Sequence, residues 1–184
     1  MPTFTTRREK HLWYGVAAVV ITIAATLFVG QPLADLFADQ NVRAAIFLLV
    51  MGLIAATVLI YTLKKRPGRV EGAAWVGMGA VYVMFFLRLG MPERSHLMEF
   101  TVLAVLLHAA LDERMSGGRG HPRAALYALL ISVLLGVVDE CAQLLVPDRV
   151  FDPADMVFNG LAAALAIGTV VGVGWVRRAF GSAH

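Results

Sequence analysis

Residues 123–146 read RAALYALLISVLLGVVDECAQLLV, and this stretch decides the class of fold. Between Ala124 and Val138 it carries no charged residue. Its length suits a bilayer-spanning helix, which needs roughly 17 to 25 apolar residues. A helix satisfies its own backbone hydrogen bonds in lipid, where no water is available to do so. The stretch therefore predicts a transmembrane helix, and the acidic pair Asp139-Glu140 stands out near its end.

The same pattern recurs along most of the 184 residues. Apolar types make up 59% of the sequence and charged types 16%, against about 45–50% and about 25% in soluble domains. These proportions exclude a water-soluble globule, and 16 basic against 13 acidic residues exclude a nucleic-acid-binding protein. The single cysteine, Cys141, excludes an intramolecular disulfide. We predict an all-α, polytopic transmembrane bundle of six helices, at residues 12–30, 42–63, 71–89, 95–111, 123–146 and 155–176.

Basic residues fall mainly on one side of the predicted membrane. Cytoplasmic segments of membrane proteins are enriched in Lys and Arg, so the richer side marks the cytoplasm. The poorer side holds Arg43, Arg88, Arg94 and Arg149. The side of the N-terminus holds the other twelve, which are Arg7, Arg8, Lys10, Lys64, Lys65, Arg66, Arg69, Arg114, Arg119, Arg123, Arg177 and Arg178. We therefore expect both termini to be cytoplasmic.

Polar residues that membrane anchoring does not explain gather at the outward ends of three spans. His96 and Glu99 share a helix face at the start of span 95–111, because they lie three residues apart. Charges in transmembrane segments are costly, and they usually face the bundle interior or a wet cavity that has a function. We expect one outward-facing polar pocket between the last three spans, lined by His96, Glu99, Asp139, Glu140, Gln143, Arg149, Asp155 and Asn159.

Several polar positions also have a structural interpretation. The order Asp152-Pro153, with Asp155 soon after, is typical of an N-cap, a proline at the first helical position and an acidic first turn. Asn159 could form a hydrogen bond between helices, as polar side chains in membrane bundles often do. Small residues recur every four positions in the last span and predict a close-packing face made of Gly160, Ala164, Gly168 and Gly172.

The polar motifs have a recognisable spacing. Residues 139–160 follow D-E-x2-Q-x5-R-x5-D-x3-N-G, and His96-x-x-Glu99-Phe100 precedes them. Over roughly residues 75–176 the chain resembles the VanZ-like family of small bacterial integral membrane proteins. Two positions depart from the family pattern: Glu93-Arg94 stands where many members have a lysine, and Phe100 where many have a tyrosine. The resemblance implies an N-terminal two-helix extension, residues 1–70, and a four-helix core, residues 71–184.

The resemblance also implies a place in the cell. It predicts a multi-pass protein of the bacterial inner or plasma membrane, and hence a role in the cell envelope. The family takes its name from a protein linked to low-level resistance to a glycopeptide antibiotic of the teicoplanin type. The resemblance supplies motif positions but no reaction, so any chemistry has to be argued from the residues.

One class of function that fits these residues is an enzyme acting on an envelope or lipid-linked, phosphate-bearing substrate. His96 would act as acid or base, and Glu99 would orient it. Asp139 or Glu140 would serve as a second base or as a metal ligand. A divalent ion would join several acids to a phosphate, because it supplies the missing positive charge. The other residues of the pocket would bind the substrate: Gln143, Arg149, Asp155 and Asn159.

The alternative is a non-catalytic accessory or structural subunit of a membrane complex. Its polar cluster would be a buried network that fixes helix packing, and its partners would be membrane lipids and a protein docked on residues 12–63. A transporter is disfavoured, because the sequence has no visible inverted repeat. A cavity reachable from outside or from lipid would favour the enzyme, whereas side chains paired off without space between them would favour the network.

Overall fold

The computed structural model describes residues 4–36, 39, 41, 42, 45, 68–88, 91–147 and 149–180. Within these ranges the ordered elements are helices and no strand occurs, which confirms the all-α class. The expected span 42–63 lies almost entirely outside the described residues, so the number of six helices stays a prediction. The other five expected spans correspond to α1 (Arg7–Leu36), α3 (Arg69–Arg88), α4 (Met91–Ser116), α5 (Pro122–Gln143) and α6 (Pro153–Phe180).

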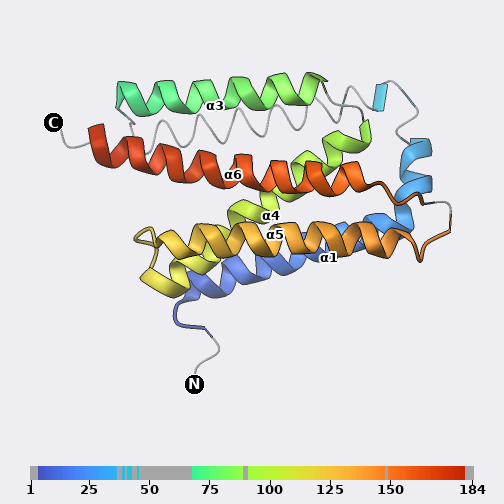
Figure 1. Ribbon diagram of the computed structural model, residues 1–184, viewed down its shortest axis with the longest axis horizontal. Helices are drawn as coiled ribbons and strands as arrows, with labels where there is room; N and C mark the ends of the chain where they lie inside the picture. Colours follow the sequence, from blue (N-terminus) through green and yellow to red (C-terminus); the bar gives the residue numbers. More distant parts are fainter. Residues whose placement is uncertain are drawn as a thin grey trace.

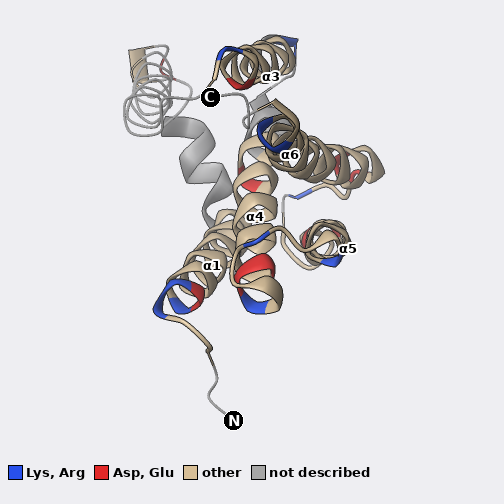
Figure 2. Ribbon diagram, turned by 90° about the vertical axis from the view of Figure 1, so that its left-hand side faces the viewer, with Lys and Arg blue, Asp and Glu red and all other residues tan. Residues whose placement is uncertain are grey.

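Helix α4 runs through the middle of the bundle. It contacts α1, α5 and α6, while α3 packs against α6 on the outside (Figures 1 and 2). Phe100, Leu103 and Leu107 of α4 are almost completely buried and form the centre of the apolar core. Their spacing of three and four residues lets one face of α4 contact its neighbours along several turns. The core is therefore built around α4 rather than around a helix at the edge.

The bundle has a basic end and an acidic end. At the basic end α1, α3 and α5 begin and α4 and α6 finish (Figure 1). The start of α1 and the end of α6 therefore lie on the same side, in the antiparallel order that the sequence predicts. The cytoplasmic assignment of that side stays a prediction. Its basic residues within the described part of the chain are Arg7, Arg8, Lys10, Arg69, Arg114, Arg119, Arg123, Arg177 and Arg178.

The surfaces of these helices are apolar. Among the described helices, three are long and apolar enough to cross a membrane: the part of α1 from Arg7 to Phe28, and the whole of α5 and α6. Large apolar side chains point outward from each of them, and Phe28, Leu134 and Val157 are 75%, 61% and 61% exposed. Contiguous apolar surface of this kind marks contact with lipid or with another protein. The molecule has the character of a membrane protein, and its number of passes stays a prediction.

Helices α5 and α6 each start with a proline that follows a capping residue. At α5, His121 caps the helix by accepting a hydrogen bond from the Arg123 main-chain N–H at 3.2 Å, and Pro122 follows. At α6, an Asp152 carboxylate oxygen accepts from the main-chain N–H of Ala154 at 2.8 Å. Proline suits the first helical position, since its missing N–H needs no partner there. The interpretation of Asp152 as a capping residue is confirmed.

The turn between α4 and α5 is held by one buried carboxylate. Asp112, just beyond the expected span 95–111, accepts hydrogen bonds from the Ser116 hydroxyl at 2.7 Å and from the main-chain N–H groups of Gly120 and His121 at 3.0 and 2.6 Å. Burial by itself raises the pKa of the Asp112 carboxyl. The hydrogen bonds from Ser116, His121 and Gly120 outweigh it, so the pKa lies below its ordinary value of 3.8.

Asp112→Asn is expected to lower the free energy of unfolding near neutral pH by about 1.5–3 kcal/mol, because a charged acceptor of several hydrogen bonds is lost. A carboxyl whose pKa is lowered by folding stabilises the protein above its unfolded pKa and loses that effect as the pH falls below it. The difference between wild type and variant should therefore shrink below about pH 3.8. Unfolding in detergent at several pH values measures it, and a constant difference would contradict this account.

Helices α5 and α6 approach each other closely at Gly136. A Cβ atom built on Gly136 would lie 2.9 Å from Cβ of Asn159 and 3.4 Å from Cε1 of Phe100. The prediction that the small residues of α6 form a close-packing face is wrong, because Ala164, Gly168 and Gly172 are exposed. The buried face of α6 is instead formed by Asn159, Ala162, Ala163, Ala166, Ile167, Thr169 and Val173. A four-residue spacing shows which residues share a face, but not which face is covered.

Gly136→Ala is expected to destabilise the protein by about 1–3 kcal/mol, because the added methyl group overpacks the contact with Asn159. Gly168→Ala is the matched control, since no atom lies within 4 Å of a Cβ built there. It places the same change in a helix at an open position and should be neutral or slightly stabilising. Thermal unfolding of both variants in one detergent provides the comparison, and equal melting temperatures would contradict the predicted contact.

Candidate functional site

Helices α5 and α6 bring acidic side chains to one histidine of α4 at the acidic end. Nε2 of His96 on α4 lies 3.6 Å from Oδ2 of Asp155 on α6 and 4.0 Å from Oε1 of Glu140 on α5. The side chains of His96, Glu140 and Asp155 are 12%, 0% and 18% exposed, so the group is largely shielded from solvent. Glu140 and Asp155 follow His96 in the sequence by 44 and 59 positions. They meet His96 because α4, α5 and α6 contact one another pairwise.

Glu140 is the most buried acid of the group. One carboxylate oxygen accepts a hydrogen bond from Nε2 of Gln143 at 3.0 Å, and the other accepts from the main-chain N–H of Asp152 at 3.5 Å. Glu140 and Gln143 share a face of α5 because they lie three residues apart. The second bond joins α5 to the residue that caps α6. Glu140 thus fixes the position of the α5–α6 link as well as facing His96.

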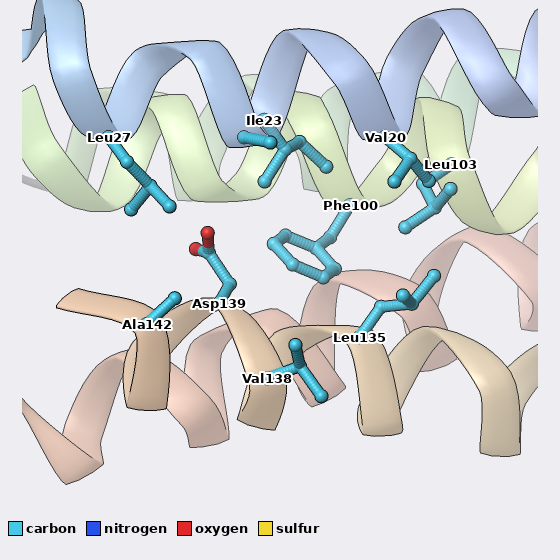
Figure 3. A pocket seen from close by; sticks show the side chains of 10 residues that line it. Val20, Ile23, Leu27, Phe100, Leu103, Leu135, Val138, Asp139 and Ala142 are labelled. Atoms are coloured by element: carbon cyan, nitrogen blue, oxygen red, sulfur yellow. The ribbon is translucent and has the colours of Figure 1, made fainter. Parts of the chain in front are cut away.

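Asp139 projects toward a different side of α5 from its neighbour Glu140. Its carboxylate points at α1 across an apolar cavity of about 120 Å³ (Figure 3). Asp139 is 8% exposed and receives no hydrogen bond from the described residues. It supplies the one charged side chain of the cavity wall, whose other members are Val20, Ile23, Ala24, Leu27, Phe100, Leu103, Leu135, Val138 and Ala142.

One potential ligand atom from each of His96, Asp139 and Glu140 lies within 4.8 Å of the other two. A neutral imidazole nitrogen and two carboxylate oxygens are common ligands of divalent transition-metal ions. Of the described residues, this is the group that meets the geometric requirement for a metal site. Asp155 approaches from the opposite helix and contacts the same imidazole nitrogen. The arrangement can hold a cation, or it can hold and release a proton at His96.

Arg149 is bound to the first helix. Its Nη2 and Nε donate to the main-chain oxygens of Thr26 at 2.5 Å and Leu27 at 3.4 Å. These carbonyls lie six and five residues before Pro32 of the same helix. The charge of Arg149 acts electrostatically on Glu99 and Asp139. It therefore lies near the acids, but its hydrogen bonds hold α1 against the α5–α6 link.

Asn159 lies deeper than the cluster, one turn along α6 from Asp155. It is completely buried, and neither atom of its amide has a hydrogen-bond partner within the described part of the chain. The same holds for the Ser132 hydroxyl on α5, one turn from Gly136. Unpaired buried polar groups are costly, so such groups in a native fold call for an explanation.

The expected pocket residues thus fall into two groups. The first group is in contact or close proximity and consists of His96, Asp139, Glu140, Gln143 and Asp155. In the second group, Arg149 acts electrostatically on Glu99 and Asp139, and Asn159 lies deeper in the bundle. The sequence analysis did not predict that α1 forms part of the cavity wall, because the residues that it contributes are apolar and resemble any other membrane-spanning stretch. It also missed Gly136, although a glycine three residues before an acidic pair in an apolar helix is a signal of close approach.

A comparison with protein families finds a match over most of the chain. The family model described as VanZ/LLP1 matches residues 12–175. The match includes almost the whole expected range of 75–176 and extends through α1, while the division at residue 70 stays a prediction. No curated protein and no solved structure matches the chain. The chain belongs to the VanZ/LLP1 family.

Proposed function

We propose that the protein binds a phosphate-bearing membrane lipid at its acidic end, with the lipid chain in the apolar cavity and the headgroup at the His96 cluster. The position of Asp139 carries this proposal. Its carboxylate belongs to the polar cluster and also to the cavity wall (Figure 3). An amphiphile needs just this kind of border between an apolar and a polar surface.

The cavity suits a hydrocarbon chain. Its walls come from α1, α4 and α5, and apart from Asp139 they are apolar. Ala24 and Val138 are exposed on the outside of the bundle, with Val138 53% exposed, so a chain can reach the cavity sideways from lipid. Entry from the membrane avoids taking the chain through water, which would cost about 0.8 kcal/mol for each CH₂ group.

The polar cluster suits a headgroup that undergoes proton transfer. Nε2 of His96 faces Glu140 and Asp155, and its Nδ1 is buried without a partner among the described residues. A histidine between two carboxylates can accept a proton from a substrate and return it. This favours an enzyme of the membrane surface, in the expected orientation the outer one, that acts on a lipid-linked envelope substrate.

A second candidate is the non-catalytic accessory subunit. The two hydrogen bonds of Glu140 favour it, because they use both carboxylate oxygens within the chain. If the cluster only fixes helix packing, Glu140→Gln should change stability alone, because it removes a buried charge but also one acceptor, and it should leave every cellular phenotype unchanged. If the cluster is functional, the same variant should fold and lose activity.

Ala24→Phe tests the lipid-binding proposal, because the larger side chain fills the cavity from α1. Ala25→Phe is the matched control, since Ala25 is exposed beside it and does not line the cavity. Binding of a fluorescent polyprenyl monophosphate in detergent, followed by anisotropy, should weaken by about tenfold or more in Ala24→Phe alone, which corresponds to about 1.4 kcal/mol. Equal affinity of the two variants, or no saturable binding by the wild type, would refute the proposal.

A further inference from the structure

We infer that His96, Asp139 and Glu140 bind one divalent transition-metal ion, and that an open position on this ion receives the lipid phosphate. The inference deepens the proposed function and rests on it only for the identity of the phosphate ligand. The metal site itself depends on the three side chains and can be tested without lipid.

The charge balance of the cluster calls for a cation. Asp139, Glu140 and Asp155 converge on a single histidine. Among the described residues, Arg149 is the basic one that acts electrostatically on Asp139, and its guanidinium donates there to main-chain oxygens of α1. Several carboxylates in a low-dielectric site repel one another and a phosphate strongly. A divalent ion removes both repulsions, because it offsets the acids and attracts the phosphate.

The unpaired state of Asp139 is an independent observation in favour of a ligand. Asp139 is only 8% exposed as a residue, and its carboxylate receives no hydrogen bond from any described residue. Buried carboxylates in proteins are normally paired, hydrogen-bonded or bound to a metal. One oxygen of this carboxylate lies within 4.8 Å of ligand atoms of His96 and Glu140, so an ion bound among the three would satisfy it.

The ligand types select the class of metal. Imidazole nitrogen suits zinc, copper, iron and nickel, whereas magnesium and calcium prefer sites made of oxygen alone. Three protein ligands with a fourth position for water or substrate are the pattern of catalytic zinc sites. Zinc bonds of about 2.1 Å put tetrahedral ligands about 3.4 Å apart, so modest side-chain rotations bring atoms within 4.8 Å onto one ion.

The opening of the site completes the argument for a phosphate. Asp139 borders the apolar cavity, so an ion beside it would face the end of a lipid chain held there (Figure 3). A phosphate oxygen is a good ligand for a divalent ion that retains an open position. The arrangement would thus bind the acyl or prenyl part and the charged part of one molecule at adjoining surfaces.

The test is titration of the EDTA-stripped protein in detergent with zinc chloride alone, followed by calorimetry and by metal analysis after gel filtration. The wild type should bind one ion per chain. Asp139→Asn, Glu140→Gln and His96→Gln should weaken binding by about 100-fold or more, since even outer partners of metal sites contribute 10- to 100-fold. Asp152→Asn is the matched control, because asparagine also caps helices and the residue is not among the three ligands.

A melting-temperature measurement keeps the test valid for variants of altered stability. Zinc should raise the melting temperature of the wild type and of Asp152→Asn, and it should leave that of the three ligand variants unchanged. Absence of saturable zinc binding by the wild type would overturn the inference. Full retention of binding by His96→Gln would also overturn it, because the ion would then lie elsewhere.

The two proposals fail in different ways. Zinc binding without any binding of polyprenyl monophosphate would uphold the metal site and refute the proposed function. Lipid binding that is unchanged by EDTA would uphold the function and refute the role of the ion in holding the phosphate. Lipid binding that is lost with EDTA and restored by zinc, but not by magnesium, would support both.

Discussion

Replacing Arg149 by alanine is expected to lower the free energy of unfolding by about 3–5 kcal/mol. The guanidinium makes two charge-assisted hydrogen bonds to the main chain of α1, at 2.5 and 3.4 Å. Its charge also offsets the acids Glu99 and Asp139. The variant loses the contact between α1 and the α5–α6 link, and it leaves both acids without that charge.

Chemical unfolding in a mild detergent measures this effect. Arg149→Lys should lie between wild type and alanine variant, because lysine keeps the charge but cannot reproduce the fork of donors that spans two carbonyls. Arg123→Ala is the control, since Arg123 is exposed at the basic end and its loss should change stability by no more than about 0.5 kcal/mol. An Arg149→Ala variant as stable as wild type would show that the link to α1 contributes nothing.

Replacing Phe100 by alanine is expected to lower the free energy of unfolding by about 3–5 kcal/mol, because the substitution creates a cavity in the core. Phe100 is fully buried, lies near Gly136 and forms part of the wall between the apolar cavity and the His96 ring, whose centroid is 6.5 Å away. The surrounding helices can collapse only in part, because their positions are fixed by other contacts.

Phe28→Ala supplies the matched control for Phe100→Ala. Phe28 belongs to α1 and is 75% exposed, so the same chemical change removes lipid-facing surface and creates no internal cavity. It should alter the free energy of unfolding by about 0.5 kcal/mol or less. If both phenylalanine variants unfolded alike, the centre of the core would have to lie elsewhere than around α4.

Much of the fold could be predicted because the length of an apolar stretch strongly indicates a membrane-spanning helix. The stretch around residues 123–146 became α5, which starts at Pro122 and ends at Gln143. Its predicted end was three residues too late, because Leu144 and its neighbours are as apolar as a helix interior although the backbone turns there. The pairing of helices was not readable, since apolar faces of similar composition suit several partners.

The meeting of the polar residues could be predicted from depth alone. Helix direction places His96, Glu140 and Asp155 at one end of the bundle, and the helices that carry them are neighbours. The depth of a residue in the membrane does not tell toward which side of its helix the side chain points. The adjacent acids Asp139 and Glu140 therefore gave no hint that one faces an apolar cavity and the other the α6 cap. Their functional roles, like that of the whole pocket, stay predictions.

The bond between Arg149 and α1 has a consequence for comparisons among related sequences. Its acceptors are main-chain oxygens, which every residue type provides. Substitutions at positions 26 and 27 therefore need no compensating change at position 149, and the contact leaves no covariation between the two segments. Methods that infer contacts from correlated substitutions will underestimate how firmly α1 is joined to the bundle.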